Sequence, residues 1–272
     1  MKANKVEHSG RFGLKVVFGL GALLAVSVGT VFAYGKLRDL YFEQCAIVDM
    51  DSQVEIVAGK MVLPGTIAEA FGLKVGANLA TIDFAQKRKN LLERIPNLRT
   101  IQISRRPPDK VRITAEERTP IAKLALTGSR KITGLVVDAE GMVFPWRPDT
   151  QTLPTIREAS TSSTPKGHRV TKRTLAALRL VEACRETEFL ELGLLEVDTS
   201  RRDFLVATLG NYSKLKILWD GMDGPSSATS RADLVKRLTR LRDTIRSHVA
   251  NDTVIWNATV PDRIFADTQG KL

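Results

Sequence analysis

An uncharged apolar run near the N-terminus constrains this chain more than any other feature. Residues 16–34 read VVFGLGALLAVSVGTVFAY, nineteen residues without a charge. At a rise of about 1.5 Å per residue, a helix of this length nearly spans a hydrocarbon core of roughly 30 Å. Four basic residues precede the run, whereas only two follow it closely. The positive-inside rule therefore predicts a cytoplasmic tail at residues 1–15, a transmembrane helix at residues 16–35 and all later residues outside the cytoplasm.

A cleaved signal peptide is the alternative interpretation of the same run. Val31 and Ala33 are small enough to occupy the positions before a cleavage site. The apolar region of a signal peptide usually has about 7–15 residues, and this run is longer. The length therefore favours an uncleaved anchor.

Small residues form a stripe along one face of the predicted transmembrane helix. They recur at every fourth position, as Gly21, Ala25, Gly29 and Ala33. Such a stripe allows close packing against a second spanning helix, although small residues are frequent in spanning helices in any case. Packing through this stripe is therefore a hypothesis.

Length, charge and cysteine content limit what the residues after the apolar run can form. The chain has 272 residues, enough for two modest domains, and a formal net charge of +11. That charge suggests an anionic surface or an acidic partner without identifying it. The chain has only two cysteines, Cys45 and Cys184. Cys184 falls on the apolar stripe of a predicted helix, which favours a buried, inert thiol, and pairing between the two is left open.

Residues 47–118, after a predicted linker at residues 36–46, alternate between strand and helix patterns. QVEIVAG alternates as a strand, a helix after Pro64 ends at Gly72, and a second helix begins with the capping pair Asp83 and Gln86. LRTIQIS and VRITAEE read as strands joined by a tight turn at RPPDK. The order strand, helix, helix, strand, strand predicts a three-stranded sheet with both helices on one face, which resembles a POTRA domain.

Residues 119–268 predict a β-rich domain with two helices, so the whole chain is of the α+β class. VVDAEGMVF reads as a hairpin with its turn at residues 139–141, and one helix is expected at residues 170–187. A second helix at residues 230–249 opens with a predicted capping box of Ser230 and Asp233. Its basic residues are Arg231, Lys236, Arg237, Arg240, Arg242 and Arg246. They favour the solvated face of a helix packed on a sheet over a binding site for anionic lipid or wall polymer.

No pattern of catalytic or metal-binding residues emerges. The three histidines, His8, His168 and His248, have no partners at metal-ligand spacing, and the sequence has no HExxH, CxxC, GxSxG or phosphate-binding glycine loop. We therefore expect no cofactor, no metal and no catalytic residue.

The motifs and their order resemble the bacterial cell-division family FtsQ, called DivIB in other lineages. The resemblance rests on the basic tail and apolar run, GLKVGANLATID, RIPNLRTIQISRRPPDKVRITAEERTPIA, VVDAEGMVF and LPTI. It implies a non-enzymatic bitopic scaffold in the inner membrane at the division septum, with FtsB/DivIC-like and FtsL-like partners and no nucleic acid or small-molecule substrate. It also implies that Glu117 and Pro120 mark the passage from the POTRA domain to the next domain.

The resemblance further implies that the terminal strand offers its edge to a partner. An exposed edge leaves unpaired N–H and C=O groups to which an extended segment can add. We place this edge on Arg263, Ile264, Phe265 and Ala266, with Thr259 nearby. The alternative is that these residues pair within the chain and bind no partner.

Two other functions remain open at this point. An exported enzyme acting on cell-wall material would need release after Ala33 and a catalytic cluster, for which no candidate residues are found. A POTRA-bearing transport component usually has a C-terminal transmembrane barrel, and no run of alternating strands of about ten residues remains to build one.

Overall fold

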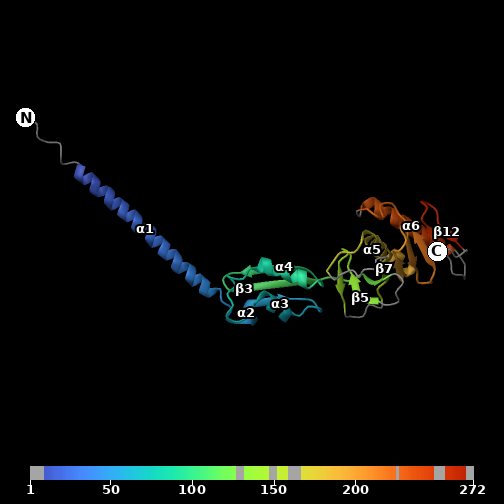
Figure 1. The fold of residues 1–272 in the computed structure, drawn as a ribbon, viewed down its shortest axis with the longest axis horizontal. Coiled ribbons are helices and arrows are strands. Elements are labelled where there is room, and N and C mark those ends of the chain that lie inside the picture. Colours follow the sequence, from blue (N-terminus) through green and yellow to red (C-terminus); the bar gives the residue numbers. More distant parts are fainter. Residues whose placement is uncertain are drawn as a thin grey trace, which may run out of the picture. The chain divides into compact units, whose positions relative to one another are not determined.

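The computed structural model describes residues 9–126, 132–146, 152–158, 167–224, 227–247 and 255–267 (Figure 1). The chain divides into two compact units. Unit 1 comprises residues 1–58, 63–88 and 101–115, and unit 2 comprises residues 59–62, 89–100 and 116–272. The last residues of the predicted POTRA segment, 116–118, therefore belong to unit 2.

A single long helix, α1 (Ser9–Gln44), begins unit 1. The predicted linker at residues 36–46 is thus helical as far as Gln44. Among the described residues, no helix combines the length and the apolar character that a membrane span requires. The end of α1 is tied to the loop that contains GANL: the Asn78 side chain donates to the carbonyl of Phe42 at 2.7 Å, and the Leu79 N–H donates to Cys45 at 2.9 Å.

Residues 54–117 form a three-stranded sheet, as the sequence pattern predicts, and its strand order is β1-β3-β2. The elements of this segment are α2 (Met50–Gln53), β1 (Val54–Val57), α3 (Pro64–Phe71), α4 (Phe84–Arg94), β2 (Leu98–Arg106) and β3 (Lys110–Glu117). The end of α4, the start of β2 and the end of β3 fall in residues assigned to unit 2. Two local predictions are confirmed. Gly72 ends α3 with a φ of 70°, in the left-handed region, and Asp83 accepts the Gln86 N–H at 3.0 Å. The rings of Phe71 and Phe84 stack 5.8 Å apart, so α3 and α4 meet in the core.

Unit 2 has one nine-stranded sheet in the order β12-β11-β10-β9-β8-β7-β4-β5-β6. Its strands are β4 (Ala122–Leu126), β5 (Ile132–Val137), β6 (Val143–Pro145), β7 (Thr155–Glu158), β8 (Glu196–Asp198), β9 (Leu205–Thr208), β10 (Lys214–Ile217), β11 (Ile255–Ala258) and β12 (Phe265–Asp267). Its helices are α5 (Lys172–Cys184), the short 3₁₀ helix η1 (Thr187–Leu192) and α6 (Ala228–Ser247). The predicted hairpin is confirmed, because β5 and β6 pair antiparallel around a turn in which Gly141 donates to Asp138.

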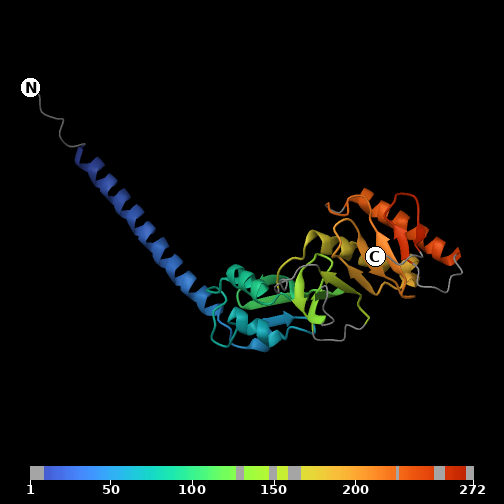
Figure 2. The ribbon, with the colours of Figure 1, turned by 45° about the vertical axis from the view of Figure 1, so that its right-hand side comes forward.

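Two crossover helices cover this sheet. β7 and β8 are parallel and are connected through α5, while β10 and β11 are parallel and are connected through α6 (Figure 2). A parallel pair needs such a crossover, because a tight turn can only join antiparallel strands. One buried cluster joins the two helices to the strands, with Leu178 and Val181 of α5 and Leu234 and Leu238 of α6 among its members.

The predicted capping box of α6 is wrong. The helix begins at Ala228, and the Ser227 hydroxyl accepts the N–H of Ser230 at 3.0 Å. Asp233 instead accepts the Asp220 N–H at 2.9 Å and pairs with Arg237. Ser230 is buried in the first turn of the helix. The contact of Asp233 with Asp220 is tertiary, so the local sequence pattern could not indicate it.

Glu117, at the end of β3, binds three consecutive backbone N–H groups. Its Oε1 atom accepts from Met61 at 2.8 Å and from Val62 at 2.7 Å, and its Oε2 atom accepts from Lys60 at 3.1 Å. A Cβ atom on Gly59 would lie 2.2 Å from the same carboxylate, which explains the glycine there. Hydrogen bonds to a charged acceptor are stronger than neutral ones, so Glu117 fixes the 59–62 loop onto the end of β3.

We expect Glu117→Ala to lower the free energy of unfolding by about 2–4 kcal/mol, because three N–H groups lose a charged acceptor together. Chemical denaturation of the full-length chain measures the loss. The matched control is Glu116→Ala, whose exposed ion pair with Arg99 should contribute less than about 1 kcal/mol. Equal losses in the two variants would contradict this role for Glu117.

Candidate functional site

The nine-stranded sheet has two edges, and the chain itself closes one of them. At β6, the Val143 N–H donates to the carbonyl of His168 at 3.0 Å, and the Val143 carbonyl accepts from Gly167 at 2.8 Å. Pro145 has no N–H group, and its carbonyl accepts from the Asn97 side chain at 2.7 Å. The outward main-chain groups of Val143 and Pro145 are thus either satisfied or absent, which leaves this edge nothing to offer a further strand.

The opposite edge, β12, is open. Its three residues pair antiparallel with β11, with Phe265 opposite Asn257 and Ala266 opposite Trp256. No other segment of the described chain pairs with the outer side of β12. Phe265 is 44% exposed. This combination of free main-chain groups and an exposed aromatic ring is the chemistry that strand addition uses.

The five predicted partner residues fall into two groups. Arg263, Phe265 and Ala266 are exposed. Ile264 packs against the core. Thr259 donates both its N–H and its hydroxyl to the Asn257 side chain. Both residues are therefore already engaged by contacts within the chain. The carboxyl ends of β10 and β11 beside Thr259 border a cavity of about 570 Å³. Partner binding by these residues stays a prediction.

The small-residue stripe lies on α1. Gly29 and Ala33 are exposed, and nothing lies within 4 Å of a Cβ atom built on Gly29. The surroundings of the Gly21 and Ala25 side chains fall outside what the structure describes. Packing through this stripe also stays a prediction.

Each basic side chain of α6 has an acidic partner within the chain. Arg231 pairs with Glu186, Lys236 and Arg240 pair with Asp262, Arg237 pairs with Asp233, and Arg242 and Arg246 pair with Glu191. Arg237 is buried and also donates to the carbonyl of Ala258 at 3.0 Å. A helix whose cations are already paired has little charge to offer an anionic polymer, so the geometry favours the packed-helix interpretation of its sequence.

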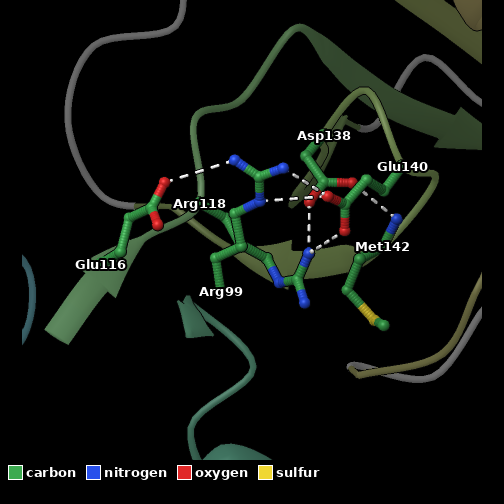
Figure 3. Close-up of polar contacts among 6 residues, drawn as sticks. All are labelled: Arg99, Glu116, Arg118, Asp138, Glu140 and Met142. Carbon is green, nitrogen blue, oxygen red and sulfur yellow. Dashed lines mark hydrogen bonds and ion pairs between the residues drawn. The ribbon is translucent and has the colours of Figure 1, made fainter. Parts of the chain in front are cut away.

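A buried ion pair follows β3 directly. Arg118 Nη1 lies 2.6 Å from Asp138 Oδ2 and 3.2 Å from Glu140 Oε2 (Figure 3). The Arg118 and Asp138 side chains are only 11% and 7% exposed. Asp138 also accepts the Met142 N–H at 2.8 Å and so fixes the β5–β6 turn. The closed β6 edge is thereby held by the residues that end the POTRA segment.

Arg99 extends this cluster toward solvent. It donates to Glu140 at 2.7 Å and 3.0 Å and to Glu116 at 3.3 Å. The hydrogen bond from Arg99 lowers the pKa of Glu140 from its ordinary value. A lowered folded-state pKa stabilises the protein above the unfolded-state pKa, and the stabilisation is lost as the pH falls through the folded-state value. The contribution of Glu140 to stability is therefore lost under acid conditions.

The other candidate residues within the described chain lie apart from one another. Cys45 and Cys184 are buried free thiols, so the predicted burial of Cys184 is confirmed, and burial raises the pKa of Cys184 to about 12. His8 and His248 lie outside the described residues, and His168 contributes its carbonyl to the β6 edge. Over the described ranges, no three His, Cys, Asp or Glu side chains come together as a metal site would require.

We expect Arg118→Met to lower the free energy of unfolding by about 3–5 kcal/mol, because it leaves Asp138 buried without its partner. Arg99→Met, which removes a half-exposed pair of similar length, should cost less than about 1 kcal/mol. Chemical denaturation of the two full-length variants separates these values. A loss for Arg118→Met no larger than that for Arg99→Met would show that the buried pair does not hold the turn.

Comparison with known proteins bears on the POTRA segment. Residues 51–118 match the family described as "POTRA domain, FtsQ-type". No curated protein matches the chain. The matched range covers β1, α3, α4, β2 and β3, the elements whose order led to the POTRA expectation. Residues 51–118 are therefore a POTRA domain of the FtsQ type, which confirms the resemblance of this chain to the FtsQ/DivIB family.

Proposed function

We propose that this chain is a non-enzymatic, single-pass membrane scaffold of the bacterial divisome, which links other division proteins at the septum. The FtsQ-type POTRA domain is the observation that carries the proposal. Proteins with this type of domain are generally non-enzymatic, and the domain implies interactions with division proteins. In this proposal the N-terminus is cytoplasmic, and the residues after 35, with the POTRA segment and the β-rich domain, lie outside the cytoplasm.

The proposed anchor is the apolar segment at residues 16–35. Its support comes from the uncharged sequence and from the charge bias of its flanks. Along the described part of α1, large apolar side chains are exposed, among them Leu24 at 69%, Val31 at 72% and Phe32 at 69%. Contiguous exposed apolar surface is costly in water and is normal against lipid. The continuation of α1 to Gln44 would then connect the lipid to the POTRA domain without a flexible segment.

The proposed recruiting surface is the open edge at β12. A partner segment that adds there in an extended conformation would satisfy the outward main-chain groups and cover Phe265. Arg263 is exposed, and within the described chain no acidic side chain pairs with it. A partner strand with an acidic residue opposite Arg263 and an apolar residue opposite Phe265 fits this edge. We propose the FtsB/DivIC-like protein as that partner and an FtsL-like protein as a further member of the same complex.

Depletion of this protein in its native cell tests the proposed role. Loss of a divisome scaffold should stop septation while growth continues, so we expect long filaments without septa in phase-contrast and membrane-stain images. Re-expression of the full chain should restore division. Normal division after complete depletion, verified by immunoblot, would reject the scaffold function.

We expect Phe265→Glu to weaken capture of the FtsB-like protein at least about tenfold, roughly 1.4 kcal/mol, since it removes a central aromatic contact and adds a charge. The unfolding midpoint should hardly change, because the side chain is 44% exposed. The matched control is Leu195→Glu, which alters a side chain of 43% exposure next to β8, far from the open edge in the strand order. Pull-down and titration of both variants measure the difference, and unchanged capture by Phe265→Glu would remove the edge from the proposal.

A further inference from the structure

The turn between β11 and β12 determines where the open edge lies. β12 has only three residues and one neighbouring strand, so few ladder hydrogen bonds hold it. The turn contains Pro261 and Asp262, and Asp262 has a φ of 65°. Asp and Asn tolerate this left-handed conformation better than most residues, although it still carries some strain. A short strand after a strained turn needs a contact elsewhere to keep its register.

Asp262 makes that contact with α6. Its Oδ1 atom lies 2.9 Å from Lys236 Nζ and 2.5 Å from Arg240 Nη2. Lys236 and Arg240 are four residues apart, so they project from the same face of the helix and converge on one oxygen. Their hydrogen bonds and charges lower the pKa of Asp262 from its ordinary value. The carboxylate is therefore ionised at neutral pH and bound to two cations.

An open pocket of about 360 Å³ lies beside these ion pairs, lined by Arg240, Asp243, Thr244 and Ser247 of α6 and by Asp262 and Ile264. Ile264 packs against the buried cluster to which α6 contributes, whereas Pro261 and Arg263 are exposed. Within the described chain, the two ion pairs therefore hold the turn to α6 alongside the apolar packing of Ile264.

The preceding strand, in contrast, is held firmly by the same helix. Arg237, one position after Lys236, is buried and donates to the carbonyl of Ala258, the last residue of β11. Asp233 holds the guanidinium of Arg237 at 2.9 Å. About two turns of α6, from Asp233 to Arg240, therefore position both the end of β11 and the turn that starts β12.

We propose that Asp262 is a positioning residue: its ion pairs with Lys236 and Arg240 clamp the β11–β12 turn to α6 and hold β12 in the register that a partner strand requires. The effect of this clamp on partner binding rests on the proposed function, because the clamped edge is the surface assigned to the partner. The clamp itself concerns the free protein and is measurable without the partner.

The first test measures amide hydrogen exchange at residues 265–267 in the full-length chain. Asp262→Asn keeps the turn geometry and removes the charge, and Asp262→Gly removes the side chain from a φ that glycine adopts freely. Loss of two exposed ion pairs should speed exchange there roughly threefold to tenfold, without change in β9. Asp243→Asn is the matched control, because Asp243 is an exposed carboxylate of α6 that pairs with Arg242. Unchanged exchange at residues 265–267 in both Asp262 variants would overturn the clamp.

Two further readouts separate an electrostatic clamp from a general structural role. Salt at roughly 1 M should speed exchange of β12 in the unaltered protein and leave it nearly unchanged in Asp262→Asn, since screening removes the same pairs. Lys236→Met with Arg240→Met should reproduce Asp262→Asn, and adding all three changes should give no further increase. Equal salt dependence in the unaltered protein and in Asp262→Asn would overturn the electrostatic assignment.

The final arm measures capture of the FtsB-like protein by the same variants. Capture should weaken by the factor found for exchange in Asp262→Asn and Asp262→Gly and stay unchanged in Asp243→Asn. Unchanged capture by the Asp262 variants, together with loss in Phe265→Glu, would overturn the positioning role while the proposed function stands. Unchanged capture by Phe265→Glu would overturn the proposed edge, and the exchange data would still decide whether Asp262 holds β12.

Discussion

Main-chain hydrogen bonding at the two edges of the nine-stranded sheet is the constraint on which the proposed function depends. An open sheet always presents two rows of unpaired groups, and each must be covered or left available. At β6 the chain covers them with Gly167, His168 and the side chain of Asn97, and it places Pro145 where a donor would otherwise point outward. At β12 nothing in the described chain does so. Within the described residues, β6 is therefore the covered edge of this sheet, and β12 has no strand paired with its outer side.

Two consecutive residues of opposite charge fix two separate segments, the 59–62 loop and the β5–β6 turn next to the closed edge. Glu117 binds the backbone of the 59–62 loop, and Arg118 binds Asp138 and Glu140 in the β5–β6 turn. Neighbouring residues of an extended chain point to opposite sides, so one dipeptide can hold both segments. The sequence pattern that the family resemblance singled out at EERTP thus has a physical explanation: the carboxylate is an acceptor for three N–H groups, and the guanidinium is a counter-ion for a buried carboxylate.

Local features were predictable from the sequence and long-range ones were not. The Gly72 cap, the Asp83 cap and the turn at residues 139–141 depend on a few adjacent residues, and each is found where the pattern indicates. The strand order of unit 2, with its three parallel pairs, depends on pairings between distant segments that no local pattern encodes. The start of α6 was mispredicted for the same reason, because Asp233 binds Asp220 and Arg237 instead of capping its helix. Of the predicted edge residues, alternation alone could not show that Ile264 packs inward.

The ion pairs of α6 also bear on how an open edge can remain free of unwanted pairing. A long, flat apolar edge invites self-association, and natural edges avoid it by being short and flanked by charge. β12 has three residues, follows Asp262 and Arg263, and ends at Asp267. Arg263 is an exposed charge next to this edge, two residues before the exposed Phe265. A strand this short gives a partner few main-chain hydrogen bonds. Under the proposed function, specificity must then come from matching side chains and from a fixed position of β12. The proposed clamp at Asp262 would supply that fixed position.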